Sequence, residues 1–198
     1  MDIILLIDGE NLKGKMRSVF KDSRIEKPNW HDYDFKGLFE KVLTGKKITR
    51  KIFYFARIKE HADSREKSKQ LIEDQRLLKT HLEAQGFEVI LSGRVRGQLE
   101  EIQNGKRVLV FKEKGVDVKI AVDMVSIAYT KKAKEIILAS SDSDMQPAIL
   151  EIRAQGVHCT YLGFEAQPNK GMTYTTNKTI LVRNAEVLEF VISQQKLI

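Results

Sequence analysis

Cysteine is nearly absent from this chain of 198 residues, and long apolar runs are missing altogether. The single cysteine, Cys159, excludes an internal disulfide, and it lies in an apolar stretch (156–162) that predicts a buried core strand. No apolar run approaches the roughly 20 residues that span a bilayer, so we expect no membrane partner. The apolar first seven residues lack a basic region and a cleavage site, which favours a strand over a signal peptide and makes the protein's expected location cytoplasmic.

Two sequence signatures of phosphate chemistry are also missing. No Asp-x-Asp-x-Thr or Asp-x-Asp-x-Val motif follows the first apolar run, and no Gly-x-x-x-x-Gly-Lys loop occurs, which weakens the case for a small-molecule phosphatase or phosphotransferase. Internal repeats, low-complexity tracts and linkers are absent as well. We therefore predict a single domain over residues 1–198, with a core over about 1–165 and a C-terminal extension over 166–198.

The composition is that of an ordinary globular protein with a basic excess. Hydrophobic residues make up 42% of the chain and charged residues 31%, which argues against disorder. The 34 Lys and Arg residues exceed the 27 Asp and Glu residues by seven, a net charge of +7. This excess favours a polyanionic partner such as nucleic acid, although a basic surface that serves only solubility gives the same total.

Short apolar runs alternate with longer helical segments along the chain. Strands are predicted at 2–8, 51–56, 87–92, 135–139 and 157–162, and helices at 63–85, 116–130 and 144–155. This alternation is typical of an α/β protein whose parallel strands are joined by crossover helices. Asn104-Gly105 between two β-type runs indicates an inserted β-hairpin around 94–112, and residues 164–178 have the composition of a polar loop.

Aspartates recur where buried elements end or begin. Asp8 ends the first predicted strand, Asp142 and Asp144 follow the fourth, and Asp117 opens the helix 116–130. Open α/β sheets build their sites just past the carboxyl ends of parallel strands. Carboxylates that meet there repel one another unless a divalent cation neutralises them. Because Mg²⁺ and Mn²⁺ prefer oxygen ligands, the pattern predicts a site for one of these ions.

For two of the aspartates at strand ends, Asp8 and Asp144, helix capping is a simpler explanation. Asp8 is in position to cap the following helix, and Asn11, in the first turn of that helix, has an amide suited to hold either Asp8 or a metal-bound water. Asp144 is a good N-cap candidate for the helix 144–155. Asp142 has no such role, so it is the stronger ligand candidate.

Two further aspartates belong to the helix 116–130. The helix dipole alone favours an acid at Asp117, but the apolar neighbours Val116 and Val118 suggest that this carboxylate leaves a buried element and needs a cationic partner. Asp123 lies about 240° around the helix from Asp117, so the two carboxylates do not share one narrow face. We therefore expect Asp123 either just outside the ligand set or in an ion pair with a nearby Lys or Arg.

The three aspartate stretches together resemble the NYN-domain family, in its LabA-like branch, within the PIN-like metal-dependent nucleases. All three motifs occur in the family's order, and the resemblance covers roughly residues 1–165. The matching residues are Ile7-Asp8-Gly9-Glu10-Asn11-Leu12, Lys114-Gly115-Val116-Asp117-Val118-Lys119-Ile120-Ala121-Val122-Asp123-Met124, Ser140-Ser141-Asp142-Ser143-Asp144-Met145-Gln146-Pro147 and Gly156-Val157-His158-Cys159-Thr160. One departure is Ser141, where the family often has glycine or asparagine.

The resemblance implies a three-layer, doubly wound α/β fold with a mostly parallel central sheet, an acidic pocket for Mg²⁺ or Mn²⁺, and cleavage of RNA phosphodiesters. It makes Asp8, Asp117 and Asp142 the metal-binding carboxylates, Asp144 a fourth acidic member and Asn11 the supporting amide. The neighbours expected just outside the ligand set are Asp123 and Ser141.

Basic residues near the strand ends and the hairpin are candidates for binding phosphate, although a solvated surface role fits any one of them equally well. They are Arg57, Lys59, Arg94, Arg96, Lys112 and Lys114. The competing function is a non-catalytic RNA- or nucleotide-binding regulatory module. No residue reads a 2′-hydroxyl, so RNA is preferred over DNA through the resemblance alone. The oligomeric state is open, with a homodimer the commonest closed form.

Overall fold

The computed structural model describes residues 2–60, 65–101 and 107–191, without the side chains of 96–113. At its centre lies a six-stranded sheet in the order β3-β2-β1-β6-β7-β8, in which every neighbouring pair is parallel. The strands are β1 (Asp2–Asp8), β2 (Arg50–Phe55), β3 (Glu88–Leu91), β6 (Ala133–Ala139), β7 (His158–Phe164) and β8 (Lys178–Val182). The five strands predicted from apolar runs are confirmed to within two residues at either end.

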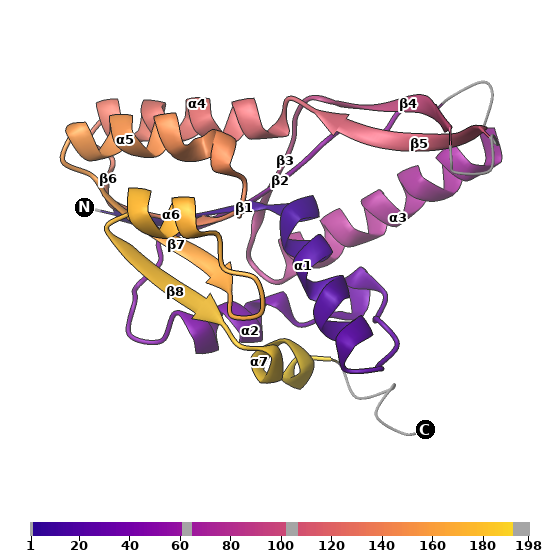
Figure 1. The fold of residues 1–198 in the computed structure, drawn as a ribbon, viewed down its shortest axis with the longest axis horizontal. Helices are drawn as coiled ribbons and strands as arrows, with labels where there is room; N and C mark the ends of the chain where they lie inside the picture. The colour runs from indigo at the N-terminus through magenta and orange to yellow at the C-terminus, as the bar shows by residue number, and fades with distance from the viewer. Residues whose placement is uncertain (1, 61–64, 102–106, 192–198) are drawn as a thin grey trace.

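Helices cover both faces of this sheet, which completes the three layers (Figure 1). One face carries α1 (Gly9–Asp22), α2 (Phe35–Val42), α3 (Arg65–Ala84) and α7 (Asn184–Glu189), and the other carries α4 (Val116–Tyr129), α5 (Gln146–Ala154) and α6 (Lys170–Thr175). Among the described residues, the 3₁₀ turns η1 (Trp30–Asp32) and η3 (Ser143–Met145) connect elements. Along β1, Leu5 and Ile7 pack into one core and Ile4 and Leu6 into the other. Successive side chains of a strand point to opposite faces, so a strand buried on both sides is continuously apolar.

The inserted hairpin is present as an antiparallel ribbon of β4 (Arg94–Glu101) and β5 (Arg107–Lys114). It forms a two-stranded sheet of its own and extends away from the central sheet (Figure 1). The predicted Asn104-Gly105 turn lies outside the described residues.

The polar stretch 164–178 is not the long loop that its composition suggested. It contains the helix α6, which Asn169 begins by accepting a hydrogen bond from the Met172 N–H. The following strand, β8, pairs with β7 as the sixth strand of the central sheet. Met172 is fully buried in the core on this face of the sheet, where α6 packs against α5.

Cys159 lies fully buried in β7, as predicted, and burial raises the pKa of its thiol to about 12. Among the described helices, none is long and apolar enough to cross a membrane.

Candidate active site

The strand order places the switch point of the sheet between β1 and β6. From β1 the chain moves outward through β2 to β3, and from β6 it moves the other way through β7 to β8. The segments that follow β1 and β6 therefore diverge to opposite sides, and open α/β sheets bind ligands in the crevice this creates. Asp8 stands at the end of β1, and Ser140, Ser141 and Asp142 follow β6.

Asp8 is held by hydrogen bonds to both of its carboxylate oxygens. Its Oδ1 accepts the Asn11 N–H at 3.1 Å as the N-cap of α1, and its Oδ2 accepts the Ser140 hydroxyl at 3.3 Å. Only 9% of the residue is exposed. Burial raises the pKa of the Asp8 carboxyl above its usual value, and the charges of Asp142 and Glu10 raise it further, while the two hydrogen bonds oppose the change. The charge of the Asp8 carboxylate is therefore poorly solvated, and a nearby cation would stabilise it.

Gly9, directly after Asp8, is required by space. A Cβ built on Gly9 would lie 2.0 Å from Cε1 of Phe55, the last residue of β2. Real Cβ atoms do not approach a ring this closely. The glycine therefore lets α1 start against the neighbouring strand end, which fixes the position of Asp8 relative to β2.

Asp142, not Asp144, caps the helical segment after β6. The Asp142 Oδ1 accepts the Asp144 N–H at 2.9 Å, and the Asp142 N–H donates to the Ser140 hydroxyl at 3.2 Å. The prediction that Asp144 caps a helix starting at 144 is wrong, because the 3₁₀ turn η3 precedes α5 and moves the cap two residues back. Asp144 is exposed, while Asp142 is half-buried.

Asn11 and Ser141 tie the two turns of the switch point together. The Asn11 Oδ1 accepts the Ser141 N–H at 3.0 Å, so this side chain joins the start of α1 to the segment after β6. The Ser141 hydroxyl lies 2.9 Å from the Tyr161 hydroxyl, and the Ser141 carbonyl accepts the Asn169 amide at 2.8 Å. The Asn11 side chain thus holds the backbone of Ser141, whereas the Asp8 carboxylate accepts its hydrogen bond from the backbone N–H of Asn11. Tyr161 and Asn169 had no signal in the sequence, since both act across long separations.

Three of the predicted carboxylates line a single hollow of about 400 Å³ at the switch point, called the acidic hollow below. Asp8 comes from β1, Asp117 from the first turn of α4 and Asp142 from the turn after β6. The lining is Asp8, Lys114, Gly115, Val116, Asp117, Val118 and Asp142. Val118 is 62% exposed, so the expectation that it buries the start of α4 is wrong. Asp144 does not line this hollow.

The donor chemistry of the acidic hollow suits a hard divalent cation, since its three acids all offer oxygen. Among the described residues, however, no three His, Cys, Asp or Glu side chains converge closely enough to form a metal cluster. Burial is the main cause of the raised pKa of Asp8, and the charge of Asp142 adds to it, so a cation in this hollow would relieve both.

A second hollow of about 580 Å³, the basic hollow, adjoins the first. Four of the six predicted cations line it, together with Leu91, Ser92, Gly93 and Gly115; they are Arg57, Lys59, Arg94 and Lys114. Backbone hydrogen bonds from Ser92 N–H to the Phe55 carbonyl, 2.9 Å, and from Val95 N–H to the Arg57 carbonyl, 3.1 Å, join the ends of β2 and β3 to the start of the ribbon. Lys114 and Gly115 line both hollows.

The NYN-domain model matches residues 2–181, which is most of the chain. The protein is a member of the NYN-domain family, within the PIN-like nuclease superfamily. The match does not distinguish the LabA-like branch, which stays a prediction. Among solved structures, the chain resembles a protein of unknown function, VPA0982, from Vibrio parahaemolyticus RIMD 2210633, with a TM-score of 0.60 and 18% identity over 91% of this chain and 92% of that one. This likeness supports the fold alone. The search of curated proteins gives no match.

Of the other predicted site residues of this NYN domain, Asp123 does not line the acidic hollow. The Asp123 carboxylate accepts hydrogen bonds from the Lys119 ammonium at 2.5 Å and from the Tyr54 hydroxyl at 3.0 Å. Of the two positions predicted for Asp123, the structure therefore has the ion pair with a nearby lysine. Arg96 and Lys112 are opposite each other in the register of the ribbon, and their side chains lie outside the described part of the chain.

Proposed function

We propose that this NYN domain is a metal-dependent nuclease that hydrolyses phosphodiester bonds in RNA. The observation that carries the proposal is the meeting of Asp8, Asp117 and Asp142, from three separate elements, in one hollow at the switch point. Membership of a nuclease superfamily supports nucleic acid as the substrate, and the net charge of +7 supports a polyanion.

Mg²⁺ or Mn²⁺ is the cofactor we propose, held by Asp8, Asp117 and Asp142. Mg²⁺ commonly binds through one or two carboxylates and keeps several of its waters, so it does not need three ligands that converge beforehand. When bound, such an ion stabilises the charge of the scissile phosphate and lowers the pKa of a bound water. Asp144 is exposed beside Asp142, and we propose for it a weaker, outer contribution.

The protein's own side chains have distinct tasks in this proposal. Asp8, largely removed from water, gains most from a cation because its charge has little solvation. Asn11 keeps Asp8 and Asp142 in register by joining their two turns. The basic hollow binds the phosphates next to the cleaved bond, and Lys114, which lines both hollows, reduces the repulsion between the approaching phosphate and the carboxylates.

The test is cleavage of labelled single-stranded RNA, and of DNA with the matched sequence, in Mg²⁺, Mn²⁺ or EDTA. We expect cutting that requires the metal, prefers RNA and falls by on the order of a hundredfold in Asp142→Asn and Asp117→Asn, the scale of losing one electrostatic group at a reaction centre. Asp22→Asn, an exposed acid on α1 with the same change of charge, is the matched control and should cut normally. Unchanged cleavage in a folded Asp142→Asn protein would refute the assignment.

The second candidate is a non-catalytic module that binds RNA or a nucleotide for regulation. The lack of a preformed metal cluster among the described residues favours it, and so does the capping role of Asp142, which explains that acid without chemistry. Binding of RNA that depends on Arg57 and Arg94, with no cutting in either metal, would establish this candidate over the nuclease.

A homodimer remains a prediction, and the surface we propose for it is a groove between α4 and α5. Its lining is almost entirely apolar, and Val122, Tyr129 and Leu150 around it are each more than half exposed. Light scattering of the wild type and of Val122→Glu tests this contact, with a dimer expected only for the wild type. A monomeric wild type at working concentration excludes the homodimer.

A further inference from the structure

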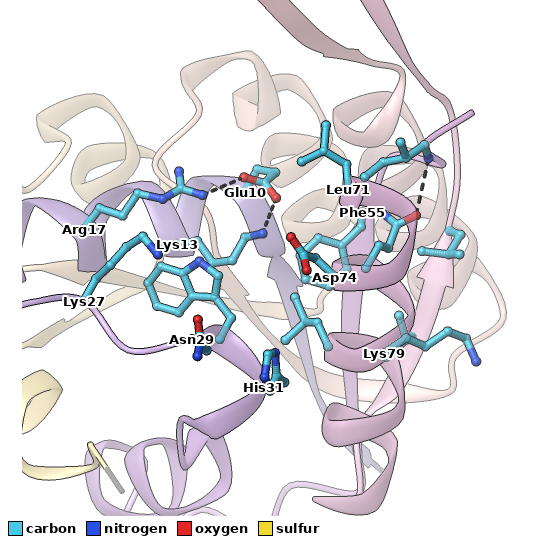
Figure 2. A pocket seen from close by; sticks show the side chains of 16 residues that line it. Glu10, Lys13, Arg17, Lys27, Asn29, His31, Phe55, Leu71, Asp74 and Lys79 are labelled. Carbon is cyan, nitrogen blue, oxygen red and sulfur yellow. Dashed lines mark hydrogen bonds and ion pairs between the residues drawn. The ribbon is translucent and has the colours of Figure 1, made fainter. Parts of the chain in front are cut away.

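A third hollow, the tryptophan hollow, opens between α1, η1 and α3 and has a volume of about 390 Å³ (Figure 2). Its lining combines the rings of Trp30 and Phe55 and leucines from α3 and β3 with a polar margin. Arg17 and Lys27 extend into it from the side of α1, while Leu71 and Asp74 face it from α3 (Figure 2). An apolar floor with a few polar groups at its edge, within about 300–1,000 Å³, is typical of small-molecule sites.

Trp30 offers a fixed aromatic surface with two cations over its ring, which a stacked base would displace toward its own phosphate. Its ring centroid lies 6.5 Å from that of Phe20 and 6.4 Å from that of Phe35, which anchors the indole to the core, while the residue stays half-buried. The Arg17 guanidinium lies 5.8 Å and the Lys27 ammonium 5.9 Å from the Trp30 centroid. The indole is therefore positioned without a ligand, so little conformational entropy is lost when one stacks on it.

The two cations keep most of their charge for a ligand. Within the described residues, Lys27 forms no ion pair, and Arg17 forms one, to Glu10, at 3.4 Å. Lys13 differs, because it is buried, pairs with Glu10 and lies 5.2 Å from the Phe55 centroid. Arg17 and Lys27 thus supply positive charge next to a flat ring. That is the pair of features that a nucleotide, with its base and its phosphate, recognises.

The tryptophan hollow continues the line of the other two. Leu91, at the end of β3, lines both it and the basic hollow, just as Lys114 lines both the basic and the acidic hollow. Phe55 in its lining is the ring that packs against Gly9, the residue after Asp8. Shared lining residues therefore connect the acidic, basic and tryptophan hollows in that order.

We propose that the tryptophan hollow binds one nucleotide unit, with the base stacked on Trp30 and the phosphate held by Arg17 and Lys27. The unit is either a free nucleotide or an unpaired residue of a single strand whose neighbouring phosphates occupy the basic hollow. A base paired in a duplex cannot turn its face to the indole, so the bound strand is single-stranded at this point. Binding here goes beyond the proposed nuclease function, because it requires no cleavage.

The first experiment uses indole fluorescence, since Trp30 is the only tryptophan in the chain. The full-length protein is titrated in EDTA with mononucleotides, with short single-stranded RNA and with ribose 5-phosphate, which lacks a base. We expect saturable quenching by RNA or by nucleotides and none by ribose 5-phosphate. Quenching by free mononucleotides identifies these as a ligand, and quenching by RNA alone identifies the strand. Unchanged emission in both titrations overturns the proposal.

The second experiment compares two double variants by fluorescence anisotropy of a labelled RNA strand at physiological salt. Arg17→Gln/Lys27→Gln removes the cations beside the ring, and Lys21→Gln/Arg24→Gln removes the same charge from exposed positions of the same segment that do not line the hollow. We expect RNA binding to be at least about tenfold weaker in Arg17→Gln/Lys27→Gln and less than about twofold weaker in Lys21→Gln/Arg24→Gln. The second, smaller loss measures the general attraction between positive charge and the phosphates. Equal losses would mean that charge alone attracts the strand, and would refute the site.

Trp30→Ala should weaken RNA binding by about ten- to a hundredfold, the range for loss of one stacked base. Because Trp30 also packs against Phe20 and Phe35, the unfolding temperature of this variant is measured alongside, and the paired charge variants decide if it does not fold. Failure of this site and failure of the nuclease proposal are distinguishable. Fluorescence reads the hollow in EDTA without cleavage, and metal-dependent cutting that survives Trp30→Ala unchanged shows an active nuclease without this site.

Discussion

Replacing Asp8 by asparagine should make the metal-free protein more stable, although it removes a residue of the proposed active site. Asparagine has nearly the same shape, and its carbonyl can still accept the Asn11 N–H that Asp8 now accepts at 3.1 Å. Its amide can donate to the Ser140 hydroxyl oxygen, which is now 3.3 Å from the carboxylate. Asparagine is also as good an N-cap as aspartate, so α1 keeps its start.

What the substitution removes is a charge that has lost most of its water. Burial is the largest cause of the raised pKa of Asp8, followed among the raising causes by the charge of Asp142. Substitutions that relieve such costs at functional sites commonly stabilise by about 0.5–2 kcal/mol. For a chain of this length, each kcal/mol should raise the melting temperature by about 2–4 °C.

The gain has a defined pH dependence in EDTA. Below 3.8, the ordinary pKa of aspartate, Asp8 is neutral in the folded and unfolded states and behaves like asparagine. As the pH rises above 3.8, the unfolded chain loses this proton before the folded one does, so the free energy of unfolding of the wild type falls until the pH passes the raised folded pKa. The advantage of Asp8→Asn therefore grows across this window and then stays constant.

Thermal or urea unfolding in EDTA, at neutral pH and below pH 3.8, measures the effect. Asp144→Asn is the matched control, because that side chain is exposed and its replacement should change stability by less than about 0.5 kcal/mol. Adding Mn²⁺ should stabilise the wild type and leave Asp8→Asn nearly unchanged, since a ligand that binds only the folded state raises its stability. An Asp8→Asn protein less stable than the wild type in EDTA at neutral pH would refute the reasoning.

Substitutions at three further positions test how the site and the sheet beneath it are held. Gly9→Ala should lower the free energy of unfolding by about 1–3 kcal/mol or more, because the new methyl group would overlap the Phe55 ring. The same variant should bind RNA more weakly. A normal melting temperature would contradict the predicted overlap. Asn11→Ala leaves the buried side of the switch point without the acceptor for a backbone N–H and should cost about 1–3 kcal/mol, whereas Asn11→Asp keeps the acceptor and should lose less in urea unfolding. Lys46→Ala should lower the free energy of unfolding by about 1–3 kcal/mol at neutral pH. The Lys46 ammonium lies 2.5 Å from the carboxylate of the largely buried Glu135 and lowers the pKa of that carboxyl, so the substitution leaves a buried charge without its partner. This loss should shrink as the pH falls through the folded pKa of that carboxyl, and a loss independent of pH in thermal unfolding would rule out the ion pair as its cause.

The positions of Asp8 and Asp142 at strand ends could be predicted because they follow from a short-range pattern, whereas Asp117 opens α4 and reaches the same hollow only through the packing of that helix. An apolar run of strand length that ends in aspartate places the carboxylate at the edge of a parallel sheet, whatever the rest of the chain does. The capping pattern after β6 could not be predicted, because the 3₁₀ turn η3 changes which N–H groups lack partners. Asp142 therefore took the cap that the sequence favoured for Asp144.

The C-terminal part of the chain also contains secondary structure that its local sequence did not predict. Residues 164–178 have the composition of a polar loop, yet they contain α6, in which Met172 is fully buried, and they lead into β8. A single buried methionine gives α6 no periodic signal in the sequence, whereas the run Ile180-Leu181-Val182 was a short β-type signal for β8 that the prediction missed. Tertiary contact supplied the stabilisation that local propensity lacked.

The sequence by itself determined the first five strands of the central sheet, the helices α3, α4 and α5, the ribbon and the charged residues next to them, because hydrophobic periodicity and glycine turns act over a few residues. The tertiary structure decided which strand ends became neighbours, and so which side chains share a hollow. Parallel pairing of β1 with both β2 and β6 joined the carboxylates to the cations of the basic hollow. Trp30, Phe55 and Leu71 came together only where α1, β2 and α3 pack, and no local pattern in the chain encodes a contact over that separation.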